Sequence, residues 1–123
     1  METTKTQDAL LTEHLSWLTY IDHVKQEIKD MQNRLMDLMP TFSTRMAMKI
    51  EQFQNRFIRQ REVTDILRHN IKAHENDIER MTRLSLDYLQ LRVASDHAAL
   101  KSEYKRYVEL FVELEQDFNE FLA

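Results

Sequence analysis

The feature that most constrains this fold is the absence of glycine: the 123 residues contain none, and only one proline. Glycine supplies the positive φ angles that tight turns, bulges and hairpins use, so a chain without it has few ways to turn. Hydrophobic residues make up 42% of the chain, which argues against disorder. We therefore expect a few long elements in a single domain covering residues 1–123.

Apolar residues in the stretch 7–39 recur with alternating steps of three and four, as on one face of a helix. They are His14, Trp17, Ile21, Val24, Ile28, Met31, Leu35 and Leu38, and Leu11 and Leu18 widen the stripe. This helix should end before Pro40, because proline disfavours the helical conformation of the residue preceding it. Thr41 or Ser43 can then cap the next helix.

A second helical stretch is predicted over residues 42–93. Its apolar stripe consists of Phe42, Met46, Ile50, Phe53, Phe57, Leu67, Ile71, Ile78, Met81 and Tyr88. Gln60, Thr64 and His74 interrupt the stripe, and either fix the register of packing or face solvent. A break near residues 70–76 is the alternative, because Asn70 tolerates a C-cap and the spacing of Asn76 and Glu79 suits a capping box.

The last helix is predicted over residues 96–122, with Ser95 and Asp96 as the best N-cap candidates. Its stripe consists of Leu100, Tyr104, Tyr107, Phe111, Leu114, Phe118 and Phe121. Leu86 and Val93 do not share a register with Met81 and Tyr88, which favours a turn near residues 92–96. The predicted fold is an all-α antiparallel bundle or coiled coil of long amphipathic helices, with three helices favoured and four possible.

No residue pattern in the sequence predicts an active site, so we expect no enzyme, no cofactor and no metal. The chain has no cysteine and no Glu-x-x-His step, and Asp65 with His69 is the kind of pair that surface helices produce by chance, as is His23 with Glu27. His14 and His74 lie on apolar stripes and could ligate haem, although core packing is the commoner role. Ser95, Asp96 and His97 are consecutive, so they diverge around a helix and suit capping better than catalysis.

Two sets of residues suggest interaction surfaces. A basic stripe (Arg45, Lys49, Arg56, Arg59) and an acidic stripe (Glu109, Glu113, Asp117, Glu120) could select a partner as flanking charges do in coiled coils. Neither bundle topology brings the stripes together readily, so we expect any contact between them to join two chains. A methionine-rich tip (Met36, Met39, Met46, Met48) surrounds the predicted first turn and is either packing or an adaptable binding surface.

The function predicted from these observations is a non-catalytic helical module for protein–protein interaction, as a homodimer or with another helical partner. One alternative is a binder of nucleic acid or anionic lipid through Arg45, Lys49, Arg56, Arg59 and Arg61, which the net charge of -4 disfavours. A second alternative is a metal- or haem-binding bundle. We expect a cytoplasmic protein, because the sequence shows no signal peptide, no membrane-spanning run and no cysteine.

Overall fold

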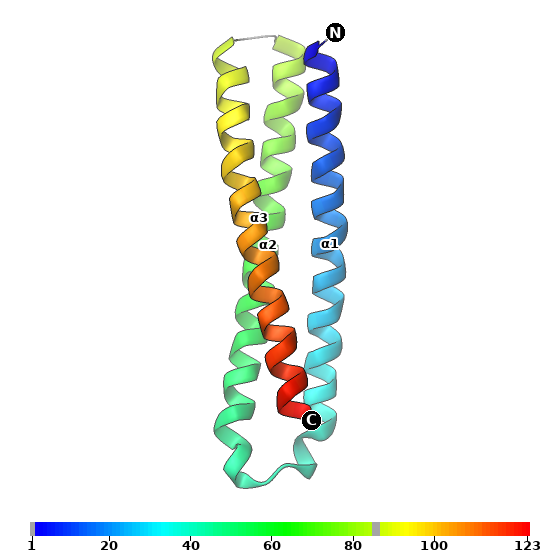
Figure 1. The fold of residues 1–123 in the computed structure, drawn as a ribbon, viewed down its shortest axis with the longest axis vertical. Helices are drawn as coiled ribbons and strands as arrows, with labels where there is room; N and C mark the ends of the chain where they lie inside the picture. Colours follow the sequence, from blue (N-terminus) through cyan, green and yellow to red (C-terminus); the bar gives the residue numbers. More distant parts are fainter. Residues whose placement is uncertain (1, 85–86) are drawn as a thin grey trace.

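The computed structural model describes residues 2–84 and 87–123, which form three long helices. They are α1 (Glu2–Leu38), α2 (Ala47–Leu84) and α3 (Asp87–Leu122), and two short 3₁₀ helices, η1 (Met39–Thr41) and η2 (Thr44–Met46), join α1 to α2. Each long helix runs antiparallel to the one before it (Figure 1). The predicted all-α bundle is confirmed with three helices. No helix in the described part of the chain is long and apolar enough to cross a membrane.

The connection between α1 and α2 follows from Pro40. Helix α1 ends at Leu38, as predicted, and Pro40 lies in a single 3₁₀ turn that begins at Met39. The hydroxyl of Thr41 donates to the carbonyl oxygen of Leu38 at 2.6 Å, so it closes the first turn rather than capping the next helix. Ser43 occupies the N-cap position of η2 with extended backbone angles, but its side chain makes no capping hydrogen bond. The predicted side-chain cap is therefore wrong, and the chain enters α2 through η2.

The predicted bounds of the second and third helices are also wrong. Helix α2 runs without a break through residues 70–76, as the favoured prediction had it, but it ends at Leu84 rather than near residue 93. Helix α3 begins at Asp87 and places Ser95 and Asp96 well inside a helix. The reason is that His97 occupies the core-facing position between Val93 and Leu100, so the three-four repeat continues through residues 92–96. Leu86 and the side chain of Tyr88, on which the predicted turn rested, lie outside the described residues.

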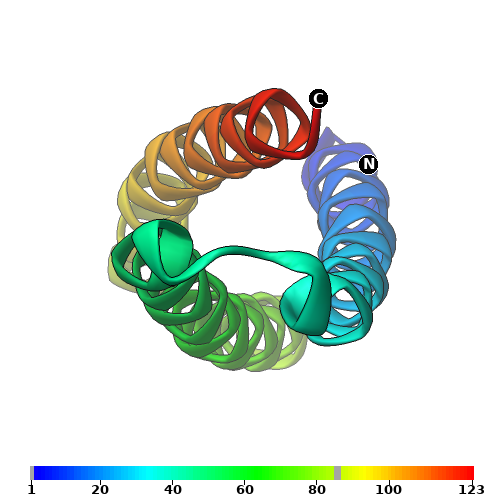
Figure 2. The same cartoon turned by 90° about the horizontal axis from the view of Figure 1, so that it is seen from below.

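The three helices surround a common axis (Figure 2), and their apolar stripes are buried between them. The main core consists of Trp17, Leu18, Ile21, Val24, Ile28, Met31, Leu35, Ile50, Phe53, Phe57, Leu67, Ile71, Leu100, Tyr107, Phe111, Leu114 and Phe118. Leu11 is 42% exposed and does not join this core. A smaller cluster consists of Ile78, Met81 and Val93, with Leu10 packed against it. It lies toward the end of the bundle where α1 begins and α2 ends.

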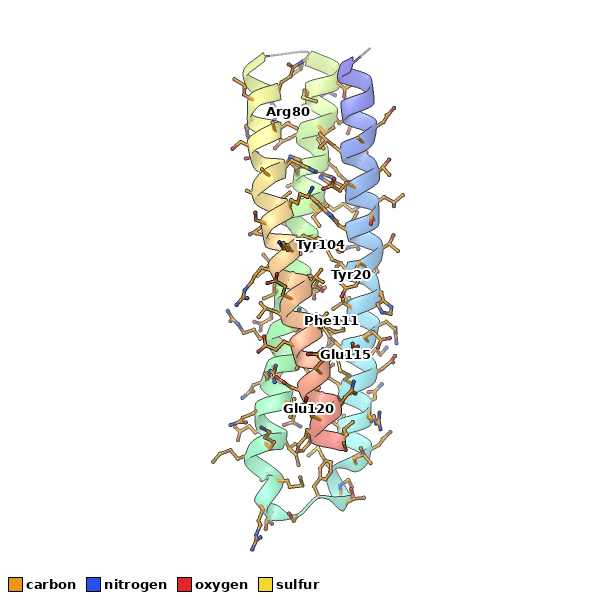
Figure 3. The ribbon with its side chains drawn as sticks, in the orientation of Figure 1. Tyr20, Arg80, Tyr104, Phe111, Glu115 and Glu120 are labelled. Carbon is orange, nitrogen blue, oxygen red and sulfur yellow. The ribbon has the colours of Figure 1, made fainter. Side chains whose placement is uncertain are left out.

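Aromatic side chains of α3 connect it to both other helices. Tyr104 and Phe111 face Tyr20 of α1, with ring centroids 6.0 and 6.5 Å apart (Figure 3). Phe118 meets Phe57 of α2 edge to face at 5.1 Å. Such pairs contribute about 0.5–1.5 kcal/mol beyond the burial of their area. The aromatic stripe of the last helix is therefore core.

Candidate functional site

The most distinctive polar feature is a layer of three histidines, one from each helix, between the main core and the smaller cluster. His14 of α1, His74 of α2 and His97 of α3 each place one ring nitrogen within 4.8 Å of the other two. His14 and His74 are buried, and His97 is half-buried. The positions of His14 and His74 on apolar stripes were predicted, whereas His97 was predicted to belong to a helix cap and its place in the core was missed.

Two of these rings are fixed by partners that can only accept hydrogen bonds. Nε2 of His74 lies 3.0 Å from the carbonyl oxygen of Val93, so this nitrogen carries the proton. Nε2 of His97 lies 3.3 Å from Oε1 of Glu13 and donates to that carboxylate. When either ring carries a single proton, its lone pair is therefore on Nδ1.

Both of these lone pairs face the third histidine. Nε2 of His14 lies 3.1 Å from Nδ1 of His74 and 3.3 Å from Nδ1 of His97. A proton on His14 Nε2 can be shared between the two acceptors. The other nitrogen of that ring, His14 Nδ1, is buried and has no hydrogen-bond partner among the residues that the structure describes.

The surroundings of His14 and His97 disfavour a positive charge on these two rings. Burial, and then the neighbouring His74 and His97, lower the pKa of His14 from 6.5 to about 4. Burial also lowers the pKa of His97, although Glu13 acts in the opposite direction. Neutral imidazoles are both hydrogen-bonding groups and metal ligands, so the layer could act as a structural polar layer or hold a metal ion.

One side of the histidine layer is covered by Trp17, whose ring stacks on that of His97 at 5.1 Å between centroids. On the partly exposed edge, Glu13 is held by both His97 and Lys101, whose Nζ lies 3.7 Å from Oε1. The two remaining histidines, His23 and His69, are exposed.

A second polar layer lies deeper in the main core. The hydroxyl of Thr64 donates to the carbonyl oxygen of Gln60 at 2.7 Å, so the hydroxyl of Tyr107 must donate to Thr64, at 2.6 Å. Burial raises the pKa of Tyr107 to about 12. Gln60, Thr64 and His74, the predicted interruptions of the second stripe, are thus all buried rather than facing solvent.

The basic and acidic stripes are joined within one chain by one ion pair, contrary to prediction. Arg56 Nη2 lies 3.0 Å from Oδ2 of Asp117, and the Arg56 guanidinium also lies over the ring of Phe53. The prediction failed because α3 begins at Asp87 rather than at residue 96 and reaches back as far as Phe42, which its Phe121 contacts. A second chain is therefore not needed to bring Arg56 and Asp117 together.

The methionine-rich tip is divided between packing and exposure. Met46 packs against the main core. Met36, Met39 and Met48 are 65%, 39% and 72% exposed. Gln54 Nε2 contacts the sulfur of Met39 at 3.7 Å, which is the one polar contact of these sulfurs among the described residues.

Comparison of the chain with protein-family models, with curated proteins and with solved structures finds no match.

Proposed function

We propose that this chain is a non-catalytic helical interaction module, and that two copies associate through the methionine-rich tip. The observation that carries this proposal is the exposure of Met36 and Met48, at 65% and 72%, on either side of the connection between α1 and α2. Burying a methionine side chain is worth about 1.5–3 kcal/mol, so covering these side chains with a second copy is favourable. Unbranched thioethers also adapt their shape to the surface they meet.

The charges around the tip distinguish this mode of association from one based on the two stripes. Arg45 and Lys49 are close in sequence to the exposed Met48, and Asp37 beside Met36 offsets only one of these two charges, so two copies meeting at their tips bring like charges together. Salt screens that repulsion and should strengthen the dimer. Association through complementary stripes would instead weaken with salt.

The test is the solution mass by light scattering at two protein concentrations and at low and high salt. The wild-type chain should approach the mass of a dimer at the higher concentration, more completely at high salt. The double substitution Met36→Gln and Met48→Gln keeps side-chain length and helix propensity but adds polarity, and should give a monomer. Leu91→Gln is the matched control, because Leu91 is 75% exposed on α3 and distant in sequence from the tip.

A wild-type monomer under all four conditions would refute self-association. A dimer that persists in the double variant would show that the two copies do not associate through the methionine-rich tip.

A further inference from the structure

We propose that His14, His74 and His97 form a binding site for one divalent transition-metal ion, with zinc the best fit. The ligand atoms are Nε2 of His14, Nδ1 of His74 and Nδ1 of His97. Each comes from a different helix, so the ion would join all three helices. This site is independent of the tip and of the proposed self-association.

The direction of the lone pairs is the first argument. The carbonyl of Val93 and the carboxylate of Glu13 fix the protons of His74 and His97 on Nε2, so both Nδ1 atoms present lone pairs toward His14. Without a cation, these two acceptors must share a single proton on His14 Nε2, across 3.1 and 3.3 Å. When His14 carries its proton on Nδ1 instead, three lone pairs converge, as metal coordination requires.

The spacing is the second argument. Zinc bonds imidazole nitrogen at about 2.0–2.1 Å in a tetrahedron, which places neighbouring ligand nitrogens about 3.3 Å apart. The separations from His14 Nε2, at 3.1 and 3.3 Å, are close to that value, and all three ligand atoms lie within 4.8 Å of one another. A haem is a poor fit, because its porphyrin would have to lie between ring nitrogens that are 3.1 Å apart.

The groups behind the ligands are the third argument. A metal-bound histidine usually donates its other N–H to a backbone carbonyl or a carboxylate, which orients the ring and raises its basicity. Val93 and Glu13 supply one of each, and Lys101 holds Glu13 in place. Three histidines leave the fourth position of a tetrahedral ion to water or a small anion.

The test uses the full chain after treatment with EDTA and removal of the chelator. Zinc titration by calorimetry should give one ion per chain, and cobalt(II) should give the intense visible absorption of a tetrahedral ion. Trp17 is the only tryptophan, and its ring centroid lies 5.1 Å from that of His14 and 5.1 Å from that of His97. Its fluorescence should therefore be quenched by copper(II) at the same stoichiometry.

Two variants and a matched control make the result decisive. Glu13→Gln leaves the three ligands in place and should weaken zinc binding by about 10- to 100-fold, as expected when a residue orienting a ligand is lost. His97→Gln removes a ligand at the exposed edge and should weaken binding further. The control replaces both exposed histidines, His23→Gln with His69→Gln, and should bind zinc like the wild type. Circular dichroism checks that each variant remains helical.

The proposal is overturned if the folded, metal-stripped wild type binds no zinc. It is equally overturned if Glu13→Gln and His97→Gln both bind like the wild type, or if the control variant loses the ion, which would place it on surface histidines.

Discussion

Acidifying the metal-free protein should lower its free energy of unfolding, because a histidine of the buried layer resists protonation in the folded state. In the unfolded chain His14 takes up a proton near its ordinary pKa of 6.5, whereas in the folded chain its pKa is about 4. Between these values the unfolded state binds a proton that the folded state does not. The contribution of His14 is therefore fully present above pH 6.5 and is lost progressively as the pH falls toward 4.

The size of the effect follows from the shift. Each unit of pKa corresponds to about 1.36 kcal/mol, so a fall from about pH 7.5 to about pH 5.0 should lower the free energy of unfolding by about 2 kcal/mol. Burial also lowers the pKa of His97, which adds a loss in the same direction, while Glu13 reduces it.

Urea unfolding followed by circular dichroism, with a chelator present at both pH values, measures this loss. His14→Leu provides the comparison, because it fills the buried position with an apolar side chain and removes the titrating group. Subtracting its pH dependence removes the contribution of the carboxylates. If the wild type and His14→Leu lose the same free energy on acidification, the reasoning about the buried imidazole is wrong.

Three further predictions concern the helix bounds, the second polar layer and the ion pair between α2 and α3. Asp96→Pro should cost about 3 kcal/mol or more, because it interrupts the interior of α3; a thermal melt close to that of the wild type would instead support a helix that begins after Ser95. Tyr107→Phe removes the donor to Thr64 and should cost about 1 kcal/mol near neutral pH, measured by urea unfolding. Because the pKa of Tyr107 is raised from 10.0 to about 12, the wild type should also lose stability as the pH rises between these values, and the variant should be spared that part of the loss. Arg56→Glu should cost at most about 1 kcal/mol, since both partners of the pair are well exposed, and should leave the solution mass unchanged; a changed mass would restore the stripes as an interface.

The sequence was sufficient to predict three long helices and most of the core. The absence of glycine limited the number of turns, and the three-four repeat identified buried residues from Trp17 to Phe118. Pro40 located the end of α1, because its effect on the preceding residue is local. Properties that depend on one residue and its neighbours in sequence were therefore predictable.

The second connection and the histidine layer were not predicted, and both errors have one cause. Ser95 and Asp96 have good N-cap propensity, but tertiary packing overrode it, and His97 in fact continues the seam from Val93 to Leu100. Because the turn was predicted too late in the sequence, the predicted last helix was too short, and its acidic stripe was expected to lie away from Arg56. The convergence of three histidines depends on the register of all three helices, which no single stretch of sequence specifies. The seam position of His97 was the signal that could have revealed it.

The length of the helices affects how the mass of this protein must be measured. Helix α1 has 37 residues and α2 has 38, and at about 1.5 Å per residue each extends roughly 55 Å, several times the diameter of one helix. Such a rod has a larger hydrodynamic radius than a sphere of equal mass. A single copy should therefore leave a gel-filtration column earlier than globular standards of 14.9 kDa. Early elution alone is thus no sign of dimerisation. Only a mass measurement that does not depend on molecular shape can distinguish one elongated monomer from a dimer.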